Sequence, residues 1–480
     1  MTDRLEREFS TADLGDVRLT KRAGRIVRRW GAMPDVSFPS MAESEADLQG
    51  LYGFLENDAV DFEELMAAHG RETLGRIDAG GAGQVVLVVH DTTSFAFGGG
   101  SEREGLGWLG YDQQGFFAHV ALAVSSDGSR QPLGVLGMSH RMRERPVRGA
   151  VKKKHDGKTS AADPNRESLR WGELVDETTE RLRGHARAIH VMDREADAYG
   201  LLCGMVQKHQ RFIVRAKHFK RPVTLPGDET RRRTRLHLVA EGAVPLVGRE
   251  AHLARRPKSP LPAANKKHPP RVSRVAKLEF ASETVTIPRA HQLDPTLPPS
   301  IDVQLVHVRE IEPPAGVEPV EWLLLTSETV ETAEDLLRVV DGYRARWLIE
   351  EFFKAIKTGC QYETRQLESA HALLIALALC IPVAWQMLAL RHLSRQQPET
   401  AASSVFSLDR LQALRTIARK PLPPTPTARD VFLAIAALGG HIARNGPPGW
   451  QTLRLGLDKL LFAEHVLDAA RRSKDPLADL

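Results

Sequence analysis

The stretch QVVLVVHDTTSF, residues 84–95, contains a continuous apolar run that is rich in β-branched residues. The run ends at Asp91 and the two threonines that follow it. Such a run predicts a buried strand. A second run, ARAIHVMDREAD, predicts another buried strand that closes on Asp193. Between them lie a predicted hairpin, which turns at residues 126–128, and a helix expected over about residues 163–184. With the short helix and the strand RFIVRAK that follow, the order β-β-β-α-β-α-β predicts an α/β core with an aspartate at the end of its first and fourth strands.

The region after this core is strongly basic. Residues 217–277 contain 16 Lys and Arg against 4 Asp and Glu, although the formal charge of the whole 480-residue chain is only +5. Prolines and strand-like pieces such as KLEFASETVTI predict an inserted β subdomain with a Pro/Lys loop at residues 255–272. EWLLLTSE then predicts a buried strand, and a single helix is expected over about residues 332–358.

The N-terminal segment VRLTKRAGRIVRRW, residues 17–30, has basic residues at helical spacing and Asp16 as a candidate N-cap. Two interpretations are open, a solvated face and a face that lies against phosphates. The candidate phosphate-binding residues on it are Arg18, Lys21, Arg22 and Arg25.

The segment ALLIALALCIPVAWQMLAL, residues 372–390, is near the length of a membrane span. Pro382 and Gln386 interrupt it, which favours a buried core helix and no membrane. The start of the chain is charged from residue 3 and lacks the apolar region of a signal peptide. Three widely separated cysteines without zinc-ligand spacing indicate a reducing cytoplasm.

The expected 332–358 helix has a polar stripe along one side. If each residue turns the helix by about 100°, the side chains of the stripe point within about 60° of each other around the helix axis. The stripe consists of Tyr343, Arg346, Glu350 and Lys357. An ordinary amphipathic helix shows such stripes too. In a ribonuclease-H-like sheet, however, Asp91 and Asp193 would close neighbouring strands, and a helix carboxylate can complete the cluster. Three carboxylates without His or Cys suit Mg²⁺ or Mn²⁺, and two such ions about 4 Å apart support in-line phosphoryl transfer.

Two features look similar to functional ones and are rejected. Glu351 lies about 100° away from the stripe, so Glu350 is the expected carboxylate. GLGWLG, residues 105–110, fits a glycine-rich dinucleotide pattern, but a strand rather than a helix is expected after it.

HDTTS at 90–94, MDREAD at 192–197 and the Tyr-x2-Arg-x3-Glu-x6-Lys spacing resemble the signature of bacterial cut-and-paste DDE transposases. The resemblance is to the insertion-sequence-four family, in the branch of the transposon-five transposase. STADLGDVRLTKR near the start and ALGGHIARNGPPGW near the end are also similar, so the resemblance covers nearly the whole chain.

The resemblance implies a ribonuclease-H-like catalytic domain with an inserted β subdomain, flanked by helical N- and C-terminal domains. The expected boundaries are 1–72 for DNA-end binding, 73–219 and 315–395 for the catalytic domain, 220–314 for the inserted basic subdomain, and 396–480 for dimerisation.

The resemblance also assigns roles to residues. It implies that the catalytic residues, which bind two Mg²⁺ or Mn²⁺ ions per site, are Asp91, Asp193 and Glu350. The residues implied to grip DNA near the cleaved end are Tyr343, Arg346 and Lys357. Trp322 matches an indole that stacks on a flipped base, and a core position in its strand is an equal alternative. Arg215 and Lys217 resemble further DNA contacts.

The function implied is a cytoplasmic bacterial transposase, associated with the nucleoid when bound. It would bind inverted-repeat ends of double-stranded DNA, cleave them through a hairpin intermediate and join the 3′ ends to target DNA as a homodimer. Leucines that recur at helical offsets, Leu453, Leu457, Leu460 and Leu467, are expected to pair two copies, although burial in their own domain is the commoner arrangement. The alternatives are a ribonuclease-H-like nuclease without strand transfer and a non-catalytic DNA-binding repressor of transposition.

Overall fold

The computed structural model describes residues 2–81, 83–99, 101–146, 169–226, 233–256, 270–404 and 406–473. The chain forms two compact units. The first unit comprises Met1–Lys152, Asp176–Arg187 and Trp347–Leu480, and the second comprises Lys153–Val175 and Ala188–Arg346. Both contain helices and strands, so the protein is of the mixed α/β class.

The first unit begins with five helices: α1 (Thr2–Arg7), α2 (Val17–Ala32), α3 (Phe38–Met41), α4 (Glu45–Leu55) and α5 (Phe62–Asp78). Helix α2 starts where the sequence predicts, because the Asp16 side chain accepts a hydrogen bond from the Arg18 backbone N–H at 2.8 Å. Its apolar face, with Trp30 fully buried, packs inward and leaves its basic residues outside.

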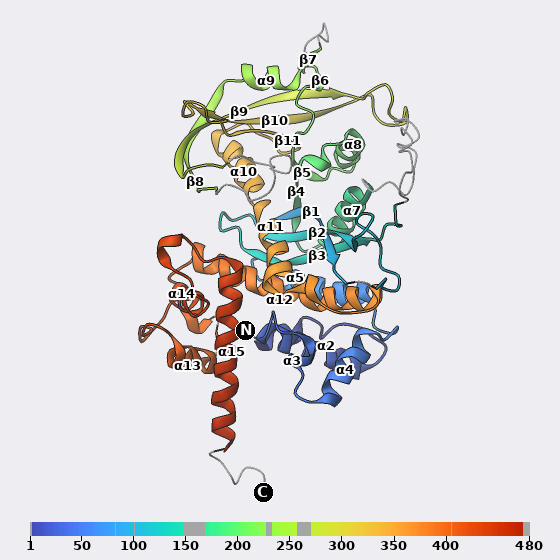
Figure 1. The fold of residues 1–480 in the computed structure, drawn as a ribbon. Helices are drawn as coiled ribbons and strands as arrows, with labels where there is room; N and C mark the ends of the chain where they lie inside the picture. Colours follow the sequence, from blue (N-terminus) through green and yellow to red (C-terminus); the bar gives the residue numbers. More distant parts are fainter. Residues whose placement is uncertain are drawn as a thin grey trace. The chain divides into compact units, whose positions relative to one another are not determined.

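Three antiparallel strands follow in the order β3-β2-β1: β1 (Val85–Phe97), β2 (Gln114–Ser125) and β3 (Pro132–Arg141). Helices α5 and α12 pack against β3 and against each other (Figure 1). The hairpin turn is the predicted one, since Asp127 accepts hydrogen bonds from Ser125 and Ser129. The predicted end of the first strand at Asp91 is wrong. Pairing with β2 continues from Asp91 to Phe97, so Asp91 lies in the middle of β1.

Helix α12 (Ala370–Gln396) contains the apolar segment of near membrane-span length. In its most apolar window of 18 residues, with a mean hydropathy of 2.3, 78% of the residues are buried inside the protein. It packs against α2, α4, α5 and α14 of the same unit. The prediction of a buried core helix is therefore confirmed.

The C-terminal helices are α13 (Leu408–Ile417), α14 (Ala428–Leu438) and α15 (Trp450–Ser473), with short turns η6 (Ala402–Ser404) and η7 (Ala443–Asn445). The expected leucine seam faces inward. Leu453 and Leu460 are buried, and Leu457 and Leu467 pack against the same core as α13 and α14. The expectation that these leucines pair two copies is wrong, because the domain's own helices cover them.

The second unit contains a mixed sheet in the order β4-β5-β11-β10-β9-β8. Its strands are β4 (Arg187–Met192), β5 (Arg211–Arg215), β8 (Pro245–Leu253), β9 (Arg274–Pro288), β10 (Ser300–Ile311) and β11 (Glu321–Thr326). Strands β4 and β5 are parallel, and the other pairs are antiparallel. A separate two-stranded sheet consists of β6 (Pro222–Val223) and β7 (Thr234–Arg235).

The helices of the second unit include α8 (Tyr199–Gln207), α9 (Leu236–Gly242) and the turn η2 (Arg194–Ala196), whereas α7 (Arg170–Arg181) contains residues of both units. The strand and helix order matches the prediction through β5. Residues 163–168 of the helix expected upstream, and most of the Pro/Lys loop, lie outside the described residues.

The single helix expected over 332–358 is wrong, because the chain forms three segments there. These are α10 (Ala333–Arg344), α11 (Trp347–Lys354) and the π-helical turn η4 (Ala355–Gly359). At the first junction, the Arg346 N–H bonds to the carbonyl of Tyr343, three residues back, which tightens the turn. In η4, the Cys360 N–H donates to the carbonyl of Ala355, five residues back, so the helical turn is wider there. A constant 100° per residue therefore does not hold along this stretch.

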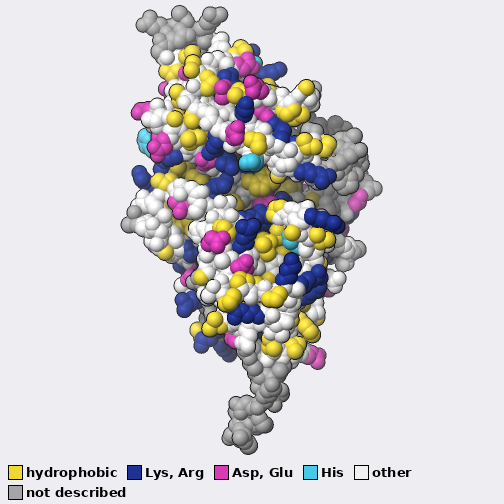
Figure 2. Space-filling view, turned by 90° about the vertical axis from the view of Figure 1, so that its left-hand side faces the viewer, with side chains coloured by type: hydrophobic (Ala, Val, Ile, Leu, Met, Phe, Trp, Pro, Cys, Tyr) yellow, Lys and Arg dark blue, Asp and Glu magenta, His cyan; other side chains and the backbone are white. Residues whose placement is uncertain are grey.

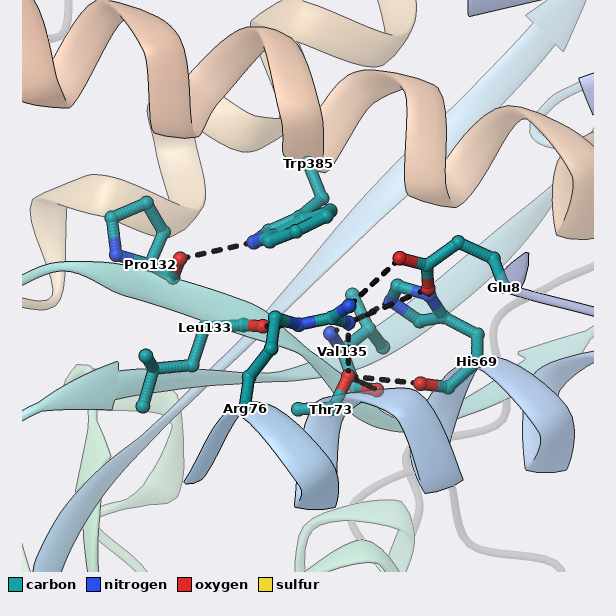
Figure 3. Close-up of polar contacts among 8 residues, drawn as sticks. All are labelled: Glu8, His69, Thr73, Arg76, Pro132, Leu133, Val135 and Trp385. Carbon is teal, nitrogen blue, oxygen red and sulfur yellow. Dashed lines mark hydrogen bonds and ion pairs between the residues drawn. The ribbon is translucent and has the colours of Figure 1, made fainter. Parts of the chain in front are cut away.

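A buried polar network joins the N-terminal segment to α5 and β3 of the first unit (Figure 3). The Val135 backbone N–H donates to Nε2 of His69 at 3.1 Å, so the ring proton lies on Nδ1 and is donated to Glu8 at 2.6 Å. Arg76 donates to Glu8 at 2.7 Å and lies 3.9 Å from the centre of the Trp385 ring. The network holds the start of the chain against α5, β3 and α12.

This network predicts acid sensitivity. Burial lowers the pKa of His69, which keeps the folded ring neutral, although Glu8 acts in the opposite direction. Below the ordinary pKa of 6.5, the unfolded chain takes up a proton that the folded chain refuses, so stability falls as pH falls. Burial alone would raise the pKa of Glu8, but His69 and Arg76 hold it below 4.5, which adds a further loss at lower pH.

We expect the free energy of unfolding to decrease between about pH 6.5 and pH 5, and His69→Gln to flatten this decrease. Denaturant unfolding at several pH values measures it. His185→Gln is the matched control, because His185 forms a more exposed pair with Asp78, with side chains 36% and 49% exposed. If the unfolding free energy of the His69 variant changed with pH as steeply as that of the wild type, His69 would not be the source of the acid sensitivity.

Candidate catalytic and DNA-binding residues

Two of the three predicted carboxylates belong to the first unit. Asp91 lies on β1 opposite Val120 of β2, and its side chain accepts a hydrogen bond from the Thr92 N–H at 2.8 Å. Glu350 lies on α11, which packs against β1. Both side chains are partly exposed. The fold thus places these two carboxylates on elements that contact each other.

Asp193, the third carboxylate, belongs to the second unit and follows the last residue of β4, as predicted. It caps η2 by accepting a hydrogen bond from the Glu195 N–H at 2.7 Å. Within the described parts of the chain, no group of three or more His, Cys, Asp or Glu is arranged to hold a metal ion. Convergence of the triad therefore stays a prediction. Its donor set, three partly exposed carboxylates, fits a hard divalent cation such as Mg²⁺.

Three predicted DNA-binding residues of the second unit lie together. The Trp322 and Tyr343 rings meet edge to face, with centroids 5.3 Å apart. The Arg215 guanidinium lies 5.9 Å from the centre of the Trp322 ring and donates to the Glu321 carbonyl at 3.2 Å. Trp322 is only partly buried. It is therefore neither a full core residue nor a fully exposed ring for base stacking. Arg215 supports the ring from one side.

Electrostatic coupling links this cluster to Asp193. Burial raises the pKa of Tyr343, and Asp193 raises it further, whereas Arg346 and Arg215 act against both. Burial lowers the pKa of Arg215, and the neighbouring guanidiniums of Arg194 and Arg346 lower it as well. Arginines crowded beside a carboxylate form a site that an additional negative group, such as a phosphate, would stabilise.

Lys357 is held against β1 in the first unit. Its Nζ donates to the Ser94 carbonyl at 2.5 Å and lies 3.6 Å from the Glu363 carboxylate. Glu363, on the turn η5 (Tyr362–Thr364), also accepts a hydrogen bond from the Ala96 N–H at 2.9 Å. Sequence reasoning missed Glu363, since it lies beyond the end of the helix and outside any periodic pattern.

Lys217 is exposed and lines an open cleft of about 1640 Å³ in the second unit. The other basic residues of the cleft are His218, Lys220, Arg221, Arg233, Arg289 and His291. Buried Asp197 shapes its wall by accepting hydrogen bonds from the Lys217 and His218 N–H groups, at 2.6 and 3.0 Å, and from Arg221. Asp197 is the last residue of MDREAD, and its structural role was not predicted.

Three family models match the chain in succession. A transposase DNA-binding model matches residues 1–60, a transposase DDE domain model matches residues 170–382, and a transposase Tn5 dimerisation domain model matches residues 382–475. The chain belongs to the DDE transposases of the Tn5 type. It is therefore an enzyme that catalyses DNA cleavage and strand transfer.

The DDE match implies a ribonuclease-H-like fold for the catalytic part of the transposase. It includes Asp193 and Glu350 and begins after Asp91. The matches also establish that the transposase binds DNA and forms dimers, as the sequence resemblance implies.

The basic residues of α2 lie in the part matched by the DNA-binding model. Arg18, Lys21, Arg22 and Arg25 are all exposed. Arg18 pairs with Asp16 at 2.7 Å, and Arg22 donates to the Gly50 carbonyl at 2.9 Å. Figure 2 shows Lys and Arg side chains spread widely over the face that it draws. The predicted exposed stripe is confirmed, and its contact with DNA stays a prediction.

The glycine-rich segment 105–110 leads into strand β2, not into a helix. Its Gly107 carbonyl accepts a hydrogen bond from the Gly115 N–H at 2.8 Å, at the start of that strand. The rejection of a dinucleotide-binding loop is thereby confirmed.

Proposed function

We propose that this transposase binds inverted-repeat transposon ends, cleaves them at the 3′ ends and joins these ends to target DNA, with Asp91, Asp193 and Glu350 as its catalytic carboxylates. The observation that carries the proposal is the position of Asp193. It follows a buried strand and acts on Tyr343, and Arg215 and Arg346 act on the same phenol, so a carboxylate and two candidate phosphate ligands surround one side chain.

The three carboxylates would hold Mg²⁺ or Mn²⁺, two ions per site. Bound ions of this kind stabilise the charge that develops during phosphoryl transfer. The protein would fix the positions of the carboxylates. Each is carried by a regular element or its end: Asp91 by β1, Asp193 by the end of β4 and Glu350 by α11. No His or Cys ligand is proposed.

Arg346 and Arg215 would bind phosphates of the DNA near the cleaved end, with Tyr343 donating a hydrogen bond beside them. Trp322 offers a partly exposed ring on which an unstacked base can lie. The proposed route passes through a hairpin, in which a base at the cleaved end is unstacked and would lie on this ring. Lys357, held beside β1, would contact the same end of the DNA.

The proposed domain order is DNA-end binding at 1–72, a catalytic domain at 73–219 and 315–395 interrupted by a basic subdomain at 220–314, and dimerisation at 396–480. Two copies would pair in the synaptic complex that holds both ends. The protein would act in the bacterial cytoplasm, on nucleoid DNA.

We predict that α2 binds DNA mainly through phosphates, so that affinity falls with salt. Replacing Arg18, Lys21, Arg22 and Arg25 together by Ala should reduce the log–log salt slope by up to about 3.6, at about 0.9 per phosphate contact. Binding titrations of an end-containing duplex at several salt concentrations measure the slope. Arg183→Ala is the control, because Arg183 is an exposed arginine that pairs with Glu180. An unchanged slope in the fourfold variant would assign the stripe to solvation.

Strand transfer itself is tested with pre-cut ends and a supercoiled target. The proposal requires covalent joining of the 3′ ends to the target in the presence of Mg²⁺. Cleavage of uncut ends without joining of pre-cut ends would indicate a nuclease. Binding without cleavage or joining would indicate a repressor.

A further inference from the structure

Glu351, the residue after the proposed catalytic Glu350, faces a different part of the first unit. Its side chain is 15% exposed and accepts hydrogen bonds from Lys354 Nζ at 2.8 Å, from Trp450 Nε1 at 3.0 Å and from Arg391. These donors come from three helices, α11, α15 and α12. A carboxylate with this many donors is held in a single orientation.

The junction is tightly packed around an ion pair. The Arg391 guanidinium lies 4.6 Å from the centre of the Trp450 ring, and its side chain is 11% exposed. Burial lowers the pKa of Arg391 to about 10, so it is still charged at neutral pH. Burial alone would raise the pKa of Glu351, but Lys354, Arg391 and Trp450 hold it below its ordinary value. Both partners are therefore ionised.

The same region joins the end of the catalytic helix to α15. Helix α15 packs against η4, which directly continues α11. A Cβ atom built at Gly359 would lie 3.0 Å from Met387 and 3.7 Å from the Trp450 ring, so these segments approach closely. Arg391 and Trp450 both lie within residues 382–475, which the dimerisation model matches. The contacts of Glu351 thus connect the dimerisation domain to the helix that carries Glu350.

We propose that Glu351 is a positioning residue that couples the dimerisation domain to the orientation of α11, and through it to the Glu350 carboxylate. The inference rests on the proposed role of Glu350. Helix α11 has only eight residues, so a fixed point at Glu351 sets its rotation about its own axis. When two copies pair, constraint on α15 reaches α11 through Trp450 and Arg391. The dimer is then the state in which Glu350 is held most firmly.

The test uses full-length protein with three variants, Glu351→Gln, Trp450→Phe and the double variant. Trp450→Phe removes the Nε1–H donor and keeps an aromatic ring over Arg391. We expect each single variant to cleave ends about 10 to 100 times more slowly in limiting Mg²⁺, with recovery at high Mg²⁺. End binding and the mass of the paired-end complex should not change. The double variant should be no slower than the slower single variant, because both changes break one connection.

A second readout is independent of activity. Hydrogen exchange of the α11 amides, residues 347–354, should slow when wild-type protein forms the paired-end complex, and should slow less in Trp450→Phe. Trp385→Phe is the matched control. Its indole lies on α12 and donates to the Pro132 carbonyl of β3 at 3.0 Å, whereas the Trp450 indole donates to Glu351. That variant should show wild-type Mg²⁺ dependence and wild-type exchange of α11.

Wild-type Mg²⁺ dependence in both single variants would overturn the proposal, as would additive effects in the double variant. Loss of the paired-end complex in Trp450→Phe would overturn it too, since the residue would then act in dimerisation itself. Failure of the proposed function looks different. In that case Glu350→Gln would still cleave, or wild-type protein would not cleave at any Mg²⁺ concentration.

Discussion

Asp91→Asn, Asp193→Asn and Glu350→Gln are each expected to slow end cleavage by at least about a thousandfold, which corresponds to roughly 4 kcal/mol. Each change keeps the shape of the side chain and removes the charge that a divalent cation requires. The proposed phosphate-binding cations, Arg215, Arg346 and the α2 stripe, are untouched, so end binding should stay within a few-fold of wild type. Single-turnover cleavage and binding titrations on the same duplex separate the two effects.

Glu195→Gln is the matched control for this series. Glu195 lies two residues from Asp193, its side chain is 60% exposed, and it pairs with Arg170 at 3.1 Å. Its substitution should leave cleavage at the wild-type rate. Should Glu351→Gln prove inactive at every Mg²⁺ concentration while Glu350→Gln cleaves normally, the assignment of the third carboxylate would be wrong by one residue.

The sequence predicts those elements that are fixed by interactions between residues near each other along the chain. Asp193 was correctly placed at the end of its strand, and Asp16 at the start of α2, because a short apolar run or a cap is a local signal. The continuation of β1 past Asp91 depends on pairing with β2 through Phe97. Thr92, Thr93 and Ser94 look like a turn in isolation, and only the partner strand makes them extended.

The same limit explains the polar stripe and the missed residues. The predicted stripe depends on a straight helix over 332–358, but a tightened turn at Arg346 and a π-helical turn at residues 355–359 change the angle per residue. Glu363 and Asp197 hold Lys357 and the basic cleft through contacts that depend on the tertiary fold. Residue type alone did not distinguish them from surface acids.

Phe462→Asp is expected to prevent formation of the paired-end complex while leaving binding to a single end intact. With the leucine seam buried inward, the exposed large apolar residues in the described part of α15 are Leu455, Phe462 and Val466, which are 36%, 73% and 51% exposed. They recur at helical offsets on the other side of the helix. Placing a carboxylate in the middle of such a face should weaken pairing at least about a hundredfold, since burying an unpaired charge costs several kcal/mol. The mass of the DNA complex reports the loss.

A point substitution tests pairing more cleanly than ending the chain near Thr427. Truncation there would remove α14 and α15, which pack against α12 and η4, and would take Trp450 away from Glu351. Leu460→Asp serves as the contrasting variant, because Leu460 is fully buried and its substitution should unfold the C-terminal helices. Phe462→Asp should keep the wild-type unfolding temperature. If that variant still forms complexes of two protomers and two ends, the exposed face of α15 does not pair the copies, and the dimer must form through another surface of the domain.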